Sequence, residues 1–300
     1  MRALTPRSSG EVISSHDGVK LHYEEFGDPG AERTVVLLPT WSLVHSRVWK
    51  MQVPFLAQRG YRVVTFDGRG NGLSERPALG YATDDFVRDT EAVMDRLRLR
   101  SAILVGFSAG GRWAVQFAAQ HATRVEQLVL IAPATVIDDG PRLLPAWFTA
   151  APPDREGWNK FNAVHWREDY RDFVTWFASM IFTEAHSTKG QDDIVLWASD
   201  TTPAMLIQTI LDSANPRLGE LWRAVDCPVL IVHGSRDAVV ALENSHKLLA
   251  ARPATQLMVL EDCGHAPHIR DAVKTNLVIE RFLATYLRQV PGESRAYARA

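Results

Sequence analysis

Hydrophobic and polar positions alternate near the start of the chain and then give way to short, continuous apolar runs. Glu11–Ser15 and Val19–Phe26 are separated by His16-Asp17-Gly18, and Asp-Gly between two alternating segments is typical of a β-hairpin. The later runs are rich in Val, Leu and Ile, as expected for parallel strands that are buried on both faces of a sheet. They cover Thr34–Pro39, Tyr61–Phe66, Ala102–Val105, Gln127–Ile131, Pro228–Val232 and Gln256–Leu260.

Segments with helical periodicity separate these predicted strands. Apolar residues recur every three or four positions over Phe86–Leu97, and we expect Thr83 to cap this helix ahead of two aspartates. Further helices are expected over Ser108–Ala118 and around Phe282–Leu287, the latter ending before Pro291. An antiparallel start followed by strand–helix alternation predicts an α/β fold, with helices on both faces of a mostly parallel sheet.

One segment interrupts this alternation. About 90 residues separate Ala134 from Pro228, which is too long for a single crossover between neighbouring strands. The segment holds 12 of the 27 aromatic residues of the chain, including Trp147, Trp158, Trp166, Trp176, Trp197 and Trp222. We expect a helical insertion on the sheet, whose aromatic residues either form its own core or line a cavity beneath it.

The composition of the 300-residue chain argues against several classes of function. Its 33 basic and 35 acidic residues give a net charge of −2, which provides no basic surface for nucleic acid. Its apolar runs are far shorter than the ~18 residues of a membrane span, and Met1–Gly10 lacks the apolar stretch of a signal peptide. Cys227 and Cys263 cannot make a disulfide framework, and Cys263–His268 has poor spacing for zinc. We therefore expect a cytoplasmic protein with no bound metal.

The strongest chemical signal is Gly106-Phe107-Ser108-Ala109-Gly110, which lies directly between an apolar run and a helical pattern. At such a strand-to-helix turn, Gly-x-Ser-x-Gly exposes the serine Oγ on a strained backbone, and the glycines leave room for neighbouring chain. The amide of Ala109 would then face an oxyanion formed at Ser108. The alternative is an ordinary turn with a helix-capping serine.

A serine nucleophile needs a base, and the base needs an orienting acid. Asp237 and His265 each follow a predicted parallel strand, so both can meet Ser108 at the carboxyl edge of the sheet. The alternatives are His268 as the base and Asp138 or Asp139 as the acid.

These features together resemble the α/β-hydrolase superfamily over nearly the whole chain. The resemblance includes the hairpin, the loop Asp67–Ser74, the turn at Ser108, and the order Ser108, Asp237, His265 along the chain. More narrowly, Leu38–Arg47 resembles actinobacterial hydrolase domains. The resemblance implies a hydrolase core at residues 1–135 and 226–300, a helical cap at residues 136–225, His265 rather than His268 as the base, and no cofactor.

The resemblance also implies a second oxyanion donor, the amide of Trp41. The chain departs from the family here, because Pro39-Thr40 replaces the usual His-Gly. We expect Trp41, Phe107, Trp147 and Trp176 to bind substrate.

The implied reaction is the hydrolysis of a small hydrophobic carboxylic ester through an acyl-enzyme on Ser108. Family members that open epoxides or remove halogens carry Asp at this position. Carbon–carbon bond hydrolysis or a lyase reaction on the same residues is one alternative, and a ligand-sensing module without turnover is another. A second copy of the chain is a partner that the sequence leaves open.

Overall fold

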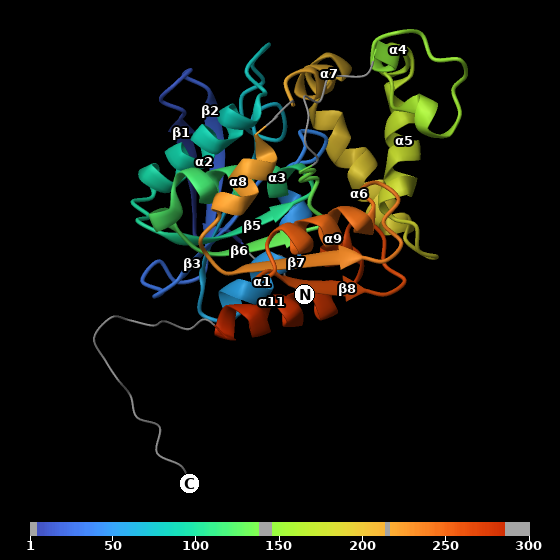
Figure 1. Cartoon of the computed structure of the whole chain (residues 1–300). Coiled ribbons are helices and arrows are strands. Elements are labelled where there is room, and N and C mark those ends of the chain that lie inside the picture. The colour runs from blue at the N-terminus through green and yellow to red at the C-terminus, as the bar shows by residue number, and fades with distance from the viewer. Residues whose placement is uncertain (1–4, 138–145, 214–216, 286–300) are drawn as a thin grey trace, which may run out of the picture.

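The computed structural model describes residues 5–137, 146–213 and 217–285, and a central sheet runs through these ranges (Figure 1). Its strands are β1 (Ser8–Ile13), β2 (Lys20–Phe26), β3 (Thr34–Leu37), β4 (Arg62–Phe66), β5 (Ala102–Phe107), β6 (Val125–Ile131), β7 (Val229–Gly234) and β8 (Gln256–Leu260). They are ordered β1-β2-β4-β3-β5-β6-β7-β8 across the sheet. The pairs β1–β2 and β2–β4 are antiparallel and the other neighbours are parallel. The predicted α/β fold with a mostly parallel sheet is confirmed.

The opening hairpin begins three residues earlier than its alternating pattern indicates. β1 starts at Ser8, which pairs with Glu25 of β2. At the tip, Gly18 has φ +81° and the Asp17 carboxylate accepts a hydrogen bond from the Val19 amide (3.2 Å). This left-handed conformation is why Asp-Gly occupies the turn.

Each predicted apolar run contains a strand, and three of the strands extend further than their runs. β6 begins two residues before its run, at Val125. β5 continues to Phe107 and β7 continues to Gly234, in each case two residues beyond the predicted end. These extensions carry the sheet to Ser108 and to the loop that holds Asp237.

Helices cover both faces of the sheet. One face carries α1 (Gln52–Gln58) and α11 (Ala272–Thr285), and the other carries α2 (Thr83–Arg96), α3 (Ala109–Gln120), α8 (Leu218–Ala224) and α9 (Leu242–Ala251). Successive residues of β3 alternate between these two cores, and Val35, Val36, Leu37 and Leu38 are all fully buried. Burial on both faces explains why the runs are continuously apolar.

The expected cap of α2 is wrong by one residue. Thr83 is the first residue of the helix, and Ala82 occupies the cap position with an extended backbone. Because alanine has no side-chain acceptor, the Asp85 carboxylate instead accepts a hydrogen bond from the Ala82 amide (2.9 Å). The end of the last predicted helix, Tyr286–Leu287, lies outside the described residues.

The long segment between β6 and β7 contains α4 (Ala163–Glu168), α5 (Tyr170–Ile181), α6 (Thr188–Trp197) and α7 (Pro203–Leu211). These four helices stand together beside the carboxyl ends of the strands, whereas α8, also part of the segment, packs on α3 (Figure 1). The described chain also contains the short helix α10 (Pro267–Arg270) and five 3₁₀ turns: η1 (Ser46–Trp49), η2 (Ala122–Arg124), η3 (Ala146–Phe148), η4 (Gly157–Lys160) and η5 (Ala198–Asp200). We call α4–α7 with η3–η5 the inserted helices; the cap limits at residues 136 and 225 stay a prediction.

Within the described ranges, no single helix is long and apolar enough to cross a membrane. One pair of neighbours, Thr188–Asp200 with Pro203–Leu211, reaches the required length and composition together, but the two are bent by 92°.

Candidate active site

Ser108 lies at the sharp turn between β5 and α3. Its backbone has φ 51° and ψ −118°, a conformation that residues other than glycine rarely adopt. A Cβ on Gly106 would lie 2.5 Å from the Gly110 carbonyl oxygen, and a Cβ on Gly110 would lie 2.3 Å from the Pro39 oxygen. Both glycines are therefore needed for the turn to close against its neighbours.

Three side chains from three different loops meet at this turn. His265 Nε2 lies 3.0 Å from Ser108 Oγ, and His265 Nδ1 lies 2.7 Å from Asp237 Oδ2. Since the carboxylate can only accept, Nδ1 carries the hydrogen and Nε2 is left to accept the Ser108 proton. The structure thus brings together the serine, acid and base that the sequence pattern singled out.

Asp237 is buried and ionised. Its side chain has no exposed area, and burial alone would raise the pKa of the carboxyl group. The charge of His265 and hydrogen bonds from the rings of His233 and His265 and from the Val240 amide outweigh that effect. Together they hold the pKa of Asp237 well below its usual range.

His268 occupies a different environment from His265. Its ring packs 4.4 Å from the ring of Phe107 and 5.0 Å from that of Trp49, and neither ring nitrogen has a hydrogen-bond partner. Burial, with the positive charge of His265 adding to it, lowers the pKa of His268 to about 3. His265, and not His268, is therefore the histidine in contact with Ser108. The alternative acids Asp138 and Asp139 lie outside the described residues.

The neighbouring cysteine is poorly suited to metal or nucleophilic chemistry. Cys263 is fully buried, and burial together with the charge of Glu184 raises the pKa of its thiol to about 12. Among the described residues, the one group with metal-ligand spacing is His16, Asp17 and Asp85, which lies at the hairpin turn and α2 rather than at Ser108.

The two expected oxyanion donors lie on adjacent parts of the backbone. Ala109 is the first residue of α3, and Trp41 follows β3, the parallel neighbour of β5. The close approach of Gly110 to Pro39 joins the two segments. Pro39 and Thr40 are thus the residues that lie against Gly110 at this turn.

The Trp41 side chain connects the core to the inserted helices. Its Nε1 donates a hydrogen bond to Thr209 Oγ1 of α7 (2.6 Å). Its ring contacts four aromatic rings of the inserted helices, at centroid distances of 5.4 to 6.4 Å: Phe161, Trp166, Phe173 and Phe177. The sequence pattern did not reveal Thr209, because its partner lies 168 positions away.

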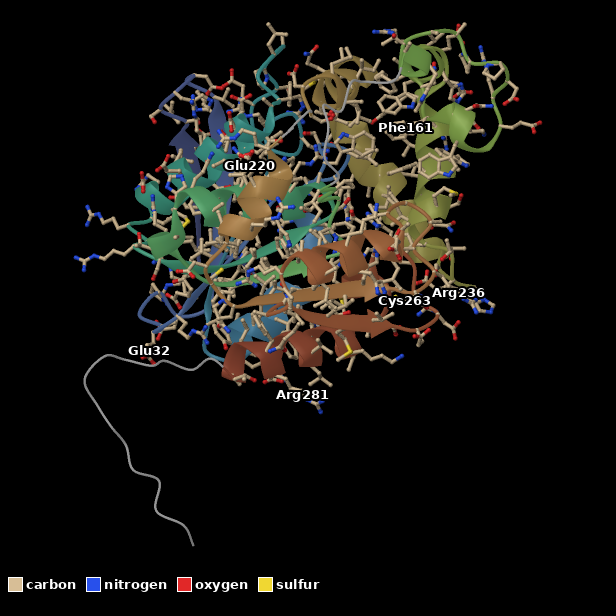
Figure 2. All side chains as sticks on the ribbon, in the orientation of Figure 1. Glu32, Phe161, Glu220, Arg236, Cys263 and Arg281 are labelled. Carbon is tan, nitrogen blue, oxygen red and sulfur yellow. The ribbon has the colours of Figure 1, made fainter. Side chains whose placement is uncertain are left out.

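A cavity of about 570 Å³ opens above Ser108 between the core and the inserted helices. Most of its lining is apolar, with aromatic side chains from both sides: Trp41, Tyr81, Phe86, Trp113, Trp158, Phe161 and Phe177. Figure 2 shows Phe161 among the inserted helices, and Arg236 and Cys263 just beyond the ends of β7 and β8. Charged groups of both signs from α3 and α9 also line the cavity: Arg112, Glu243 and Lys247.

Three aromatic residues expected to bind substrate do not line this cavity. Phe107 packs instead against the rings of His265 and His268, at centroid distances of 5.0 and 4.4 Å. Trp147 is 53% exposed on the outside of the inserted helices. Trp176 lies one layer further out, 5.2 Å from the ring of Trp158, which takes its place at the cavity wall.

Comparison with known proteins gives a consistent result. A sequence model of the alpha/beta hydrolase fold matches residues 33–272. The AB hydrolase superfamily protein YisY of Bacillus subtilis is 26% identical over 285 residues, which cover 91% of this chain and 98% of that protein. A non-heme haloperoxidase of Rhodococcus erythropolis is 28% identical over 241 residues, covering 78% and 84% of the two chains.

Solved structures share the architecture. An esterase from Exiguobacterium antarcticum superimposes with a TM-score of 0.77 at 24% identity, covering 92% of this chain and 99% of that chain. At this level of identity, the similarity concerns the fold.

Proposed function

Because the chain belongs to the alpha/beta hydrolase fold family, we propose that it is a serine hydrolase that cleaves small hydrophobic carboxylic esters. The observation that carries the proposal is the continuous series of contacts from Ser108 Oγ through His265 to Asp237, at 3.0 and 2.7 Å, on the floor of an aromatic cavity. A nucleophile, a base and an orienting acid in this geometry are what acyl transfer requires.

In the proposed acylation step, Ser108 Oγ attacks the ester carbonyl carbon while His265 Nε2 takes the serine proton. Asp237 holds the imidazole in the required tautomer and stabilises its positive charge. The amides of Ala109 and Trp41 stabilise the negative charge on the carbonyl oxygen. When the tetrahedral intermediate collapses, His265 returns the proton to the leaving alkoxide, and the alcohol departs.

In the deacylation step, a water molecule takes the place of the alcohol. His265 Nε2 accepts a proton from the water as its oxygen attacks the acyl carbon, and the same proton returns to Ser108 Oγ when the carboxylic acid leaves. The protein thus returns to its starting protonation state.

The cavity lining supports a hydrophobic substrate. Burial of each additional methylene contributes about 0.8 kcal/mol of binding free energy, which favours medium acyl or aromatic groups over acetate. The charged groups on α3 and α9 include both signs, so the lining presents no uniformly basic wall to a strongly anionic substrate.

The direct test is turnover of p-nitrophenyl hexanoate by the purified protein and by Ser108→Ala. The wild type should release p-nitrophenol and the variant should not, because the nucleophile is gone. Ser74→Ala is a matched control, since Ser74 is another buried serine whose hydroxyl bonds only to His22 and Asp67. Equal turnover by the wild type and Ser108→Ala would rule out the proposal.

A further inference from the structure

His233 is a buried histidine to which the proposed mechanism assigns no task. It belongs to β7, four positions before Asp237, and its side chain has no exposed area. A single histidine inside an apolar strand is ordinarily a core residue, so the sequence pattern gave no reason to select it. Its ring nevertheless contacts the carboxylate that orients His265.

The partners of the His233 ring define where its hydrogen lies. Nε2 is 2.9 Å from the Val240 carbonyl oxygen and 3.0 Å from Asp237 Oδ2, and both of these oxygens are acceptors only. Nε2 must therefore carry a hydrogen. Nδ1 lies 2.6 Å from Ser245 Oγ, whose hydroxyl can donate to it and so leave the hydrogen on Nε2.

These contacts complete the set of donors around the Asp237 carboxylate. Oδ1 accepts from the amides of Val239 and Val240, both at 2.8 Å. Oδ2 accepts from His265 Nδ1 at 2.7 Å and faces His233 Nε2 at 3.0 Å. Oδ1 thus accepts two hydrogen bonds, whereas Oδ2 accepts one from His265 and lies against the single Nε2 hydrogen of His233, which it shares with the Val240 carbonyl oxygen. These contacts orient the carboxylate and disperse its negative charge.

We propose that His233 is a positioning residue for Asp237, and that the Ser245 hydroxyl fixes the ring tautomer that this task requires. The inference rests on the proposed function, because Asp237 needs a fixed orientation only if His265 acts as the base for Ser108. His233 touches no substrate atom. It holds Oδ2 in line with His265 and moderates the charge that the carboxylate presents to that ring.

Removing the His233 donor has a predictable electrostatic direction. The negative charge on Oδ2 would then act more strongly on His265 and favour its imidazolium form. The acidic limb of the pH profile of kcat/KM should therefore move to higher pH. Other titratable groups lie near the His265 ring, and a substitution at His233 leaves them unchanged. They are His268 in α10 (Pro267–Arg270), Cys263 in the loop that carries His265, and Glu184, which accepts from the Gly264 amide.

The experiment measures kcat, KM and the pH profile for p-nitrophenyl hexanoate with three variants. His233→Phe removes both ring nitrogens and should lower kcat by about 10²-fold, with the acidic limb moved to higher pH. His233→Gln retains an amide donor and should recover part of the rate. Ser245→Ala leaves the ring in place but frees its tautomer, and should lower kcat by about 10-fold.

The controls separate a positioning role from simple loss of packing. Ser74→Ala loses a comparable buried hydroxyl away from Asp237, and its pH profile should match that of the wild type. If His233→Phe fails to fold, Ser245→Ala carries the same test. A far-downfield proton resonance from the His265–Asp237 hydrogen bond should be present in the wild type and shifted in each folded variant of His233 or Ser245.

Two results would overturn the inference or its premise, and they can be distinguished. If Ser245→Ala and folded His233→Phe had the same pH profile as the wild type and an unshifted proton resonance, His233 would be only a packing residue. A wild type that neither turns over the ester nor reacts with a fluorophosphonate would instead refute the proposed function itself.

Discussion

Ser108 and His265 are the residues on which the chemistry depends most directly. Ser108 has a strained backbone conformation, and the two glycines beside it have no space for a side chain. The His265 ring lies between the Ser108 hydroxyl and the Asp237 carboxylate. The strain fixes the nucleophile before substrate arrives, so no reorganisation is needed during the reaction.

Residues that act as one unit should show non-additive losses. Ser108→Ala and His265→Ala should each lower kcat by several orders of magnitude, and the double variant should be scarcely slower than either single one. Steady-state turnover of p-nitrophenyl hexanoate measures this. If His265→Ala kept near-wild-type turnover while His268→Ala was inactive, His268 would be the base.

His268 should make the protein less stable in mild acid. Its pKa is about 3 in the folded chain against about 6.5 when unfolded, so between these values the unfolded state binds more protons. The contribution of His268 to the free energy of unfolding therefore falls as pH decreases from about 6.5 toward 3, by up to about 1.4 kcal/mol per pH unit.

Urea unfolding of the wild type and His268→Phe at pH 7 and pH 5 tests this expectation. The difference in free energy of unfolding between them should shift in favour of the variant at pH 5. A difference that is the same at both pH values would show that His268 is not held neutral by its surroundings.

At the scale of elements, the inserted helices hold the loop that carries His265. The His265 amide donates to the Ile181 carbonyl at the end of α5 (3.0 Å), and the Gly264 amide donates to Glu184 Oε1 (2.7 Å). A Cβ on Gly264 would lie 2.9 Å from the same Ile181 oxygen, which explains the glycine there. The position of the base therefore depends on the end of α5 as well as on β8.

Glu184 gives a test of this coupling. Glu184→Ala removes the acceptor for the Gly264 amide and should lower kcat by about 10-fold with little change in KM, because the base is displaced while the cavity is not. Glu184→Gln keeps an oxygen acceptor and should stay close to the wild type in the same assay. Equal kcat values for the Ala and Gln variants would show that the contact does not position His265.

The elements also show what the sequence could predict. Continuous apolar runs identified β3 to β7 because strands buried on both faces have no polar side, and the glycines around Ser108 identified the turn by steric need. The run of β8 also marked a strand, but the expected burial on both faces is wrong there, because β8 lies at the edge of the sheet and leaves Met258 41% exposed. The direction of individual aromatic side chains could not be predicted in this way. Phe107 lies beneath His265 and Trp147 faces outward, since both orientations depend on contacts with distant segments.

At the scale of the whole molecule, one aromatic cluster joins the core to the inserted helices. Trp41 extends from the core into a group of rings from α4, α5 and the residue that follows η4, and is fixed there by Thr209 of α7. Both of the expected alternatives, an aromatic core within the insertion and an aromatic cavity wall, are present: Trp166 is fully buried in the cluster, and Phe161 also lines the cavity.

The cavity should select substrates by their acyl chain. For p-nitrophenyl esters, kcat/KM should rise from acetate through butyrate to hexanoate, because each methylene that enters the apolar lining contributes about 0.8 kcal/mol. The matched series uses one leaving group, so only burial of the acyl chain changes. Values of kcat/KM that are flat or that fall along the series would contradict an acyl-binding role for this cavity.

The central claim is that Ser108 is a nucleophile activated by His265, and covalent labelling tests it most directly. After reaction with a fluorophosphonate, intact-mass and peptide mass spectrometry should find one adduct per chain, located on Ser108. The adduct should be absent in Ser108→Ala and should form several orders of magnitude more slowly in His265→Ala. An adduct on another residue, or the same labelling rate in His265→Ala as in the wild type, would contradict the account.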